Sequence, residues 1–545
     1  MALNMADLFE HAVDAYPQRV ALIFGDRRVT YAGLEDEANR LAHHLAGQGI
    51  RPGDHVGFYA RNSIAAVATL LAVIKLRAVA ININYRYLAA ELGYHLRDAD
   101  VAALVHDLAL APIVAEAAPD DLPRVVVGGD YDEVLKGESG ERDFGPRSPD
   151  DVYIIYTGGT TGQPKGVMWR NEDIWRTLAG GVDFVTGEVL ADEWAQSRKG
   201  AQGNGMVRMS PAPLIHGAAM VATLGCLFAG DSSVILPKFD PHALWAAVQR
   251  YRVNVLSIIG DAMARPLLEA LAEGDYDTSS LFSLNSTAAL FSPSVKEGIA
   301  KALPSVFLTE AVGATETGFT GMAFGGGSAE HHDGPRITPV PDVIVIDDLG
   351  SVCGPGQTGK LARGGYLPIG YYKDPVKTAE MFHEVNGKRY VAAGDWARVE
   401  EDGMITLLGR GNTSVNTGGE KVFPEEVEGA LKSHPDVFDS LVLGVPDERL
   451  GQRVAALVEL RPGAVADVGA LQAHVRARIA GYKAPRSIWL VESIGRTVSG
   501  KADYRWARRY AQEHPPATAD PDTVPTAQPA PELAADPGDS AERGL

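Results

Sequence analysis

DVYIIYTGGTTGQPKGVMW, residues 151–169, is the most informative segment of the amino-acid sequence. Its apolar first half is typical of a buried β-strand, and a loop of small and hydroxyl-bearing residues follows directly. Glycines let backbone N–H groups approach phosphate oxygens, threonine hydroxyls add donors, and a lysine adds a positive charge. The residues with these properties are Thr157, Gly158, Gly159, Thr160, Thr161, Gly162, Lys165 and Gly166. The segment therefore predicts a phosphate-binding loop at the end of a strand.

A flexible Gly/Thr turn is the alternative interpretation of this loop. A lone glycine cluster would fit that alternative, but a strand followed by so many donors favours phosphate binding. The loop is not of the Walker A type, because Lys165 is followed by Gly166 and not by serine or threonine.

The composition limits the class of protein. A chain of 545 residues is too long for one ordinary core and predicts two or three packed units. Its formal net charge of -20 repels nucleic acid, whereas a local loop can still bind a nucleotide. The two cysteines, Cys226 and Cys353, fit a reducing compartment, and the N-terminus has no basic start before an apolar run. We expect a cytoplasmic protein without a membrane span.

The order of apolar segments predicts the domain organisation. Short apolar strands at residues 55–60, 78–84 and 102–107 alternate with helical patterns, which predicts a large, layered, multi-sheet α/β N-terminal domain over residues 1–410. The pattern then restarts with two helices and two strands, which predict a small α+β C-terminal domain over residues 411–512. Residues 513–545 are rich in Pro, Ala and Asp and predict a disordered tail.

Seven further motifs follow the loop. They are APLIHGAA around His216, VGATETG with Gly313, Thr315 and Glu316, GYYKDP from Gly370, AAGDWA around Asp395, LLGRGN around Arg410, TGGEKVFPEEVE with Gly418 and Gly419, and GRTVSGKADYR around Lys501. Together with the loop, their order resembles the adenylate-forming superfamily, which includes acyl-CoA synthetases, luciferases and peptide-synthetase adenylation domains. The resemblance runs from Leu8 to Arg508 and implies a C-terminal domain that rotates on a hinge. It is also compatible with a homodimer.

The resemblance implies an enzyme that activates a carboxylic acid with ATP. In this reading the loop binds the β- and γ-phosphates, Thr315 donates to the α-phosphate, and Glu316 helps to hold Mg2+. Gly313 belongs to the nucleotide site, and Asp395 binds the ribose hydroxyls with Arg410 nearby. Taken alone, Glu316 or Asp395 would more often be a surface acid, and Arg410 could form an interdomain salt bridge.

The second half of the implied reaction passes the acyl group to the thiol of CoA. Lys501 is expected to bridge the carboxylate and the α-phosphate before that step, because two anions must meet there. Gly418 and Gly419 are expected to line the pantetheine tunnel, where a side chain would not fit. His216 resembles a ring that gates the acyl pocket, with simple packing as the alternative.

The identity of the acid rests on a narrower resemblance. KGVMWRNEDIWR, GDAMARPLLEAL and NSTAALFSPSVKE are similar to actinobacterial ligases that activate steroid side-chain acids such as 3-oxocholest-4-en-26-oate. Small residues in NSTAALFS and HGAAM are compatible with a wide apolar pocket or with ordinary core. A medium- or long-chain fatty acid is the second candidate. An enzyme that loads a carrier protein is a different class, and no carrier-like segment follows Lys501.

Overall fold

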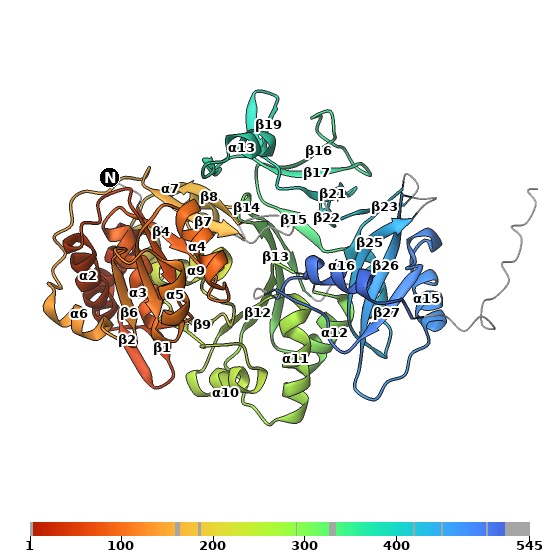
Figure 1. Cartoon of the computed structure of the whole chain (residues 1–545), viewed down its shortest axis with the longest axis horizontal. Coiled ribbons are helices and arrows are strands. Elements are labelled where there is room, and N and C mark those ends of the chain that lie inside the picture. The colour runs from red at the N-terminus through yellow and green to blue at the C-terminus, as the bar shows by residue number, and fades with distance from the viewer. Residues whose placement is uncertain are drawn as a thin grey trace, which may run out of the picture.

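The structure is a computed structural model of the whole chain, of which we describe residues 4–157, 164–183, 187–289, 291–325, 334–411, 413–417, 420–447, 451–497 and 500–517. We leave aside the side chains of residues 410, 416, 420, 421 and 451. Figure 1 shows a large N-terminal part, coloured red to teal, beside a smaller blue C-terminal part. The described part of the chain contains no helix that is long and apolar enough to cross a membrane.

A four-stranded parallel sheet forms the first layer. Its order is β4 (Val79–Asn82), β3 (His55–Tyr59), β5 (Val101–Asp107) and β6 (Arg124–Val127). All residues of β3 and β4 are buried, as expected for parallel strands covered on both faces. The helices of this region are α2 (Tyr31–Gly47), α3 (Ile64–Lys75), α4 (Ala89–Asp98), α5 (Ala111–Ala117) and α6 (Tyr131–Gly137), with a 3-10 turn at Leu108–Leu110. The strands and helix predicted here from the apolar spacing are present.

A fifteen-stranded sheet forms the centre of the N-terminal part. Its order is β19, β20, β17, β21, β22, β15, β14, β13, β12, β11, β9, β10, β1 and β2, and β16 pairs with β17. The bounds are β1 Val20–Phe24, β2 Arg27–Thr30, β9 Val207–Met209, β10 Ser232–Val234, β11 Val255–Ile258, β12 Ser283–Thr287, β13 Phe307–Ala314, β14 Gly318–Phe324, β15 Arg336–Pro339, β16 Val343–Ile346, β17 Thr358–Arg363, β19 Phe382–Val385, β20 Lys388–Val391, β21 Asp395–Val399 and β22 Ile405–Arg410. The helices between these strands are α9 (Gly217–Phe228), α10 (Pro241–Tyr251), α11 (Gly260–Glu273), α12 (Pro293–Ala302) and α13 (Pro375–Met381).

A three-stranded sheet carries the phosphate loop. Its order is β18 (Gly370–Tyr371), β8 (Lys165–Arg170) and β7 (Val152–Thr157). The helices α1 (Met5–Ala15), α7 (Asn171–Leu178) and α8 (Ala195–Ala201) lie near it. The large apolar core packs this sheet against α3 and α9 through fully buried side chains such as Trp169 and Trp175.

The C-terminal domain is a mixed sheet with helices. Its strand order is β24 (Glu420–Val422), β23 (Val415–Thr417), β26 (Gly451–Leu460) and β25 (Val437–Asp447), and β27 (Ser487–Val491) pairs with β26. The helices are α14 (Pro424–Lys432), α15 (Val468–Arg476) and α16 (Tyr504–Glu513), with a 3-10 turn at Gly481–Lys483. Figure 1 shows this domain beside α11 and α12. The predicted fold class, a large layered α/β domain with a small α+β domain, is confirmed.

All residues of the apolar helix α3 are buried, including Lys75. The Nζ atom of Lys75 lies 3.2 Å from Glu35 Oε1 and also contacts Glu10. Arg147 donates to Glu10 over 2.8 Å. Burial lowers the pKa of Lys75, and the two carboxylates counteract that effect. Lys75 therefore ties α1, α2 and α3 together by charge.

We predict that Lys75→Met lowers the free energy of unfolding by about 3 kcal/mol, because it leaves two buried carboxylates without their shared cation. Lys136→Met is the control, since Lys136 forms an exposed pair with Glu133 and should change stability by less than about 0.5 kcal/mol. Urea unfolding followed by circular dichroism measures both. Equal unfolding midpoints for the two variants would contradict the assignment.

Candidate active site

The phosphate loop connects two antiparallel strands. Thr157 at the end of β7 pairs with Lys165 at the start of β8, so the loop closes a hairpin. Gly166 has no room for a side chain, because a Cβ atom there would lie 2.7 Å from Ile154 and 2.8 Å from Tyr156. The predicted binding residues Gly158, Gly159, Thr160, Thr161 and Gly162 lie outside the described residues.

Asn82 fixes the strand that enters this loop. Its side chain is buried at the end of β4, where Nδ2 donates to Tyr156 O over 3.0 Å and Oδ1 accepts from Tyr156 N over 2.8 Å. Nδ2 also donates to Ile215 O over 2.5 Å, directly before His216. One amide therefore joins the phosphate-loop strand to the His216 loop. Our sequence reasoning missed Asn82, and the signal was a polar residue within the apolar run AVAININ.

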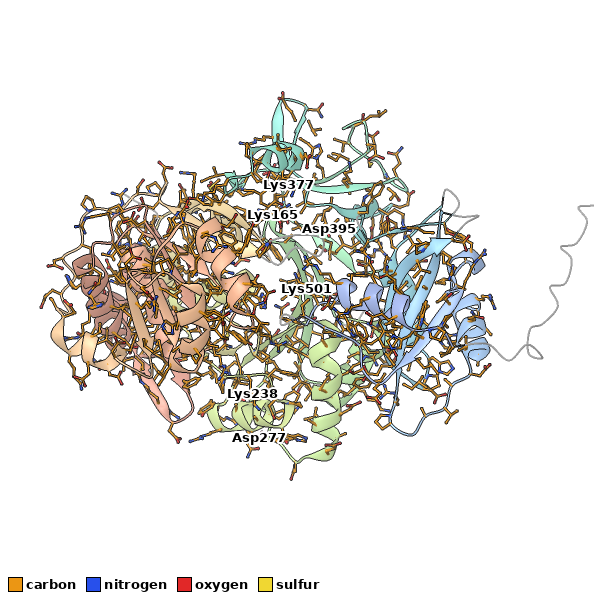
Figure 2. The ribbon with its side chains drawn as sticks, viewed as in Figure 1. Lys165, Lys238, Asp277, Lys377, Asp395 and Lys501 are labelled. Atoms are coloured by element: carbon orange, nitrogen blue, oxygen red, sulfur yellow. The ribbon has the colours of Figure 1, made fainter. Side chains whose placement is uncertain are left out.

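Lys165 lies in a group of charged and aromatic side chains. Its Nζ atom is 5.1 Å from the centre of the Tyr371 ring, and the Tyr371 hydroxyl donates to Glu316 Oε1 over 3.0 Å. Burial lowers the pKa of Lys165, and the neighbouring Lys377 adds to this lowering. Figure 2 shows Lys165 and Lys377 next to each other. Two adjacent ammonium groups favour a bound anion such as a polyphosphate. Lys377 and Tyr371 were also missed, although GYYKDP marked their segment.

The turn that carries Thr315 and Glu316 joins β13 to β14. Trp169 of β8 donates its Nε1–H to Thr315 O over 3.0 Å, so the phosphate-loop hairpin holds this turn. Gly313 faces the backbone of β14, where a Cβ atom would lie 2.3 Å from Gly318 O. The structure thus brings Thr315, Glu316 and Lys165 together, as the motifs predicted.

Asp395 begins β21 and pairs with Arg410 at the end of β22. Figure 2 shows Asp395 in the same region of this view as Lys165 and Lys377. The side chain of Arg410 and the residues Gly418 and Gly419 lie outside the described part of the chain, so their predicted roles stay predictions.

His216 precedes α9 and faces the C-terminal domain. Its ring is partly exposed, but Nε2 is shielded from solvent and has no hydrogen-bond partner within the described residues. Burial and, as the smaller cause, the positive charge of Lys501 lower the pKa of His216 to about 4. The charge of Lys501 in the small domain therefore acts on His216 in the large domain. An apolar cavity of about 10 Å³ lies between α3 and α9 and is lined by Phe58, Ala66, Val67, Leu70, Leu214, Met220, Thr223 and Leu224.

Comparison with known proteins agrees with this arrangement. Residues 9–372 match the family described as AMP-binding enzyme, and residues 426–501 match the AMP-binding enzyme C-terminal domain. The chain belongs to the AMP-binding enzyme family. The family predicted from the motifs is thus confirmed.

Two curated relatives and one solved structure illustrate the similarity. The medium/long-chain-fatty-acid–CoA/3-oxocholest-4-en-26-oate–CoA ligase of Mycobacterium tuberculosis is 50% identical over 94% of this chain and 97% of its own length. The 3-oxocholest-4-en-26-oate–CoA ligase of Rhodococcus rhodochrous is 49% identical over 93% of this chain and 96% of its own length. ATP-bound MatB from Rhodopseudomonas palustris aligns with a TM-score of 0.80 at 26% identity, covering 93% of this chain and 99% of MatB. The predicted resemblance to actinobacterial steroid-acid ligases is confirmed.

The donor set near the loop fits a magnesium ion that arrives with the nucleotide. Magnesium in such sites is held by one or two carboxylates, phosphate oxygens and water. Glu316 supplies one carboxylate, and Oε1 already accepts a hydrogen bond that orients it. Among the described residues there is no cluster of three or more potential metal ligands.

We predict a specific pH dependence from His216. The pKa of His216 lies below its ordinary value of 6.5, so the unfolded chain takes up a proton first as the pH falls. The folded state therefore loses stability between pH 6.5 and pH 4. His216→Gln should lose about 1–2 kcal/mol less stability than the wild type between about pH 7.5 and about pH 5. Urea unfolding at both pH values measures this difference, and identical losses in the two proteins would contradict it.

Proposed function

We propose that this chain is an ATP-dependent acyl-CoA ligase that forms an acyl adenylate and then transfers the acyl group to CoA. The observation that carries the proposal is the group of Lys165, Tyr371 and Glu316 at the phosphate-loop hairpin, in a chain that belongs to the AMP-binding enzyme family. The charge of Lys501 in the small domain acts on His216, whose loop Asn82 joins to the phosphate-loop strand. Carboxylate activation needs such a cation between a phosphate site and an acyl site.

In the first half-reaction, a carboxylate oxygen of the acid attacks the α-phosphorus of ATP. The bond from that phosphorus to pyrophosphate breaks, and the acid oxygen becomes part of the new anhydride. Lys501 offsets the repulsion between the two anions, and Thr315 donates to the α-phosphate. Lys165 and Lys377 neutralise the charge that accumulates on the leaving pyrophosphate. Asp395 accepts hydrogen bonds from the ribose hydroxyls.

The remaining predicted residues complete the nucleotide site. The loop residues from Thr157 to Gly162 donate to the β- and γ-phosphates, Gly313 lets the backbone approach the nucleotide, and Arg410 assists Asp395. Glu316 would hold Mg2+, which neutralises negative charge on the polyphosphate when bound. Tyr371 orients Glu316 for this task through its hydroxyl.

In the second half-reaction, the sulfur of CoA attacks the acyl carbon, and the bond from that carbon to the AMP oxygen breaks. Lys501 must move away to admit the thiol. We propose that the domain of residues 411–512 rotates after residue 410 and brings Gly418 and Gly419 to the pantetheine arm. Gating of the acyl pocket is proposed for His216, whose low pKa keeps the ring uncharged and therefore tolerant of an apolar neighbour.

The proposed acid is a bulky apolar one. The relatives named above act on 3-oxocholest-4-en-26-oate, and one of them also on medium- and long-chain fatty acids. Identity of about half over nearly the whole length supports the same acids here, with the steroid acid first and the fatty acids second. The cavity between α3 and α9 is too small for either acid, so its lining must rearrange if the acid enters there. Location in the cytoplasm and a homodimer remain predictions.

We predict that Lys501→Ala lowers the rate of acyl-adenylate formation at least about a hundredfold, because the charge between two reacting anions is lost. Formation of the thioester from supplied acyl adenylate and CoA should stay largely intact. Acid-dependent ATP–pyrophosphate exchange measures the first reaction, and AMP release measures the second. Lys238→Ala is the control, since Figure 2 shows Lys238 well away from Lys501 and its side chain is exposed. Equal loss of both reactions in Lys501→Ala would contradict the assigned role.

We also predict the order of substrates. Steroid side-chain acids should give the highest kcat/KM, followed by medium- and long-chain fatty acids, in an assay of pyrophosphate release. Acetate and aromatic acids serve as controls and should be poor substrates, because they leave a wide apolar pocket unfilled. A preference for acetate or aromatic acids would overturn the proposed substrate class.

A further inference from the structure

A line of charged side chains crosses from the large domain to the small one. Asp261 lies in the first turn of α11, and its Oδ2 atom is 3.8 Å from Nζ of Lys432, the last residue of α14. Both side chains are only 2% exposed. Arg265 lies 3.4 Å from the same carboxylate, one turn further along α11. A charge buried this deeply destabilises the protein unless a group of opposite charge lies beside it.

From Lys432 the line continues to the loop that carries Lys501. Lys432 Nζ lies 3.2 Å from Asp439 Oδ1, and Asp439 Oδ2 accepts from Arg496 Nε over 2.9 Å. Arg496 Nη1 in turn donates to Gly500 O over 3.0 Å, one residue before Lys501. The peptide N–H of residue 497 donates to the carbonyl of residue 501 over 2.8 Å, which closes the loop. Four consecutive contacts therefore connect Asp261 to Gly500, the residue before Lys501.

The start of α11 also contacts the loop that carries Lys501, at the other end of this line of charged side chains. A Cβ atom on Gly500 would lie 3.4 Å from Ala262 Cβ and 3.5 Å from Ile259 Cγ2, so the Lys501 loop packs on the same helical turn that carries Asp261. A cavity of about 180 Å³ borders this line, because Arg265 and Lys432 belong to its lining. The other lining residues also come from both domains and include Leu268, Glu269, Ser294, His434 and Arg461.

The interdomain contact differs from the contacts within the small domain. Lys432 keeps Asp439 and Glu428 as partners wherever the small domain lies, because all three belong to that domain. Its contact with Asp261 exists only when the two domains are arranged as in this structure. The free energy of the Asp261–Lys432 contact therefore favours this one arrangement.

We propose that Asp261 and Lys432 are positioning residues that hold the small domain in the orientation for acyl-adenylate formation and, through Asp439 and Arg496, place Lys501. The proposal rests on the role proposed above for Lys501. Neither Asp261 nor Lys432 touches the reacting groups. Weakening their contact lowers the population of the adenylate-forming orientation and leaves the thioester-forming orientation available.

The test is a pair of charge-removing variants, Asp261→Asn and Lys432→Met. Asparagine retains an oxygen that accepts the Ser292 N–H bonded to Asp261 Oδ1 over 2.8 Å, so the large domain keeps that hydrogen bond. Glu269→Gln is the matched control. Its partner Arg461 lies 3.4 Å away across the same interface, but the two side chains are 47% and 43% exposed. Exposed pairs of this kind contribute little.

ATP–pyrophosphate exchange and thioester formation from supplied acyl adenylate are measured for every variant. In Asp261→Asn and Lys432→Met we expect exchange to fall at least about tenfold, while thioester formation stays within about twofold of the wild type. The double variant should lose little more exchange than either single variant, because both remove the same contact. Glu269→Gln should leave both reactions within about twofold.

Three results would overturn the positioning role: unchanged exchange in both single variants, equal loss of both half-reactions, or additive losses in the double variant. Lys501→Ala is assayed in parallel and separates this failure from failure of the proposed function. If Lys501→Ala retains exchange, the role of Lys501 itself is wrong. If it loses exchange while Asp261→Asn does not, only the positioning role is wrong.

Discussion

Repulsion between two anions is the constraint on which the rest of this structure depends. A carboxylate and a triphosphate must approach within bonding distance. Water could screen the repulsion between their charges only if it occupied the space that the reacting groups need. In the proposed mechanism, cations from separate elements offset this repulsion: Lys165 from a hairpin, Lys377 from a helix, and Lys501 from a different domain. Because the mechanism has the domain of Lys501 rotate away, the same space would later admit the thiol.

In the proposed mechanism, the binding groups of the large domain stay fixed and Lys501 of the small domain moves. Asn82 and Trp169 bind the phosphate-loop hairpin to the His216 loop and to the Thr315 turn within the large domain. These contacts are buried or partly buried and join elements far apart in sequence, so they give a rigid floor for the nucleotide. Between the domains, the buried contact of Asp261 with Lys432 lies beside a cavity. The proposed rotation would break this contact, so its free energy affects the balance between the two orientations.

The sequence was sufficient for the fold class and the family. Apolar runs such as that of β3 and motifs around Lys165 or Lys501 contain this information locally. Asn82, Lys377 and the Asp261–Lys432 contact were not predictable, because each acquires its meaning from a partner 70 or more residues away or on another domain. The burial of Lys75 was not predictable either, because a lysine at the end of an apolar helix is usually solvated.

The most direct test of the central claim follows the oxygen atoms of the acid. If a carboxylate oxygen attacks the α-phosphorus, an acid labelled with oxygen-18 in its carboxylate must transfer one labelled oxygen to AMP when the thioester forms. Mass spectrometry of the AMP from a single turnover with a steroid or fatty acid and CoA measures this transfer. We predict one labelled oxygen in the phosphate of AMP. Label in inorganic phosphate with ADP as the nucleotide product, or unlabelled AMP, would contradict the account.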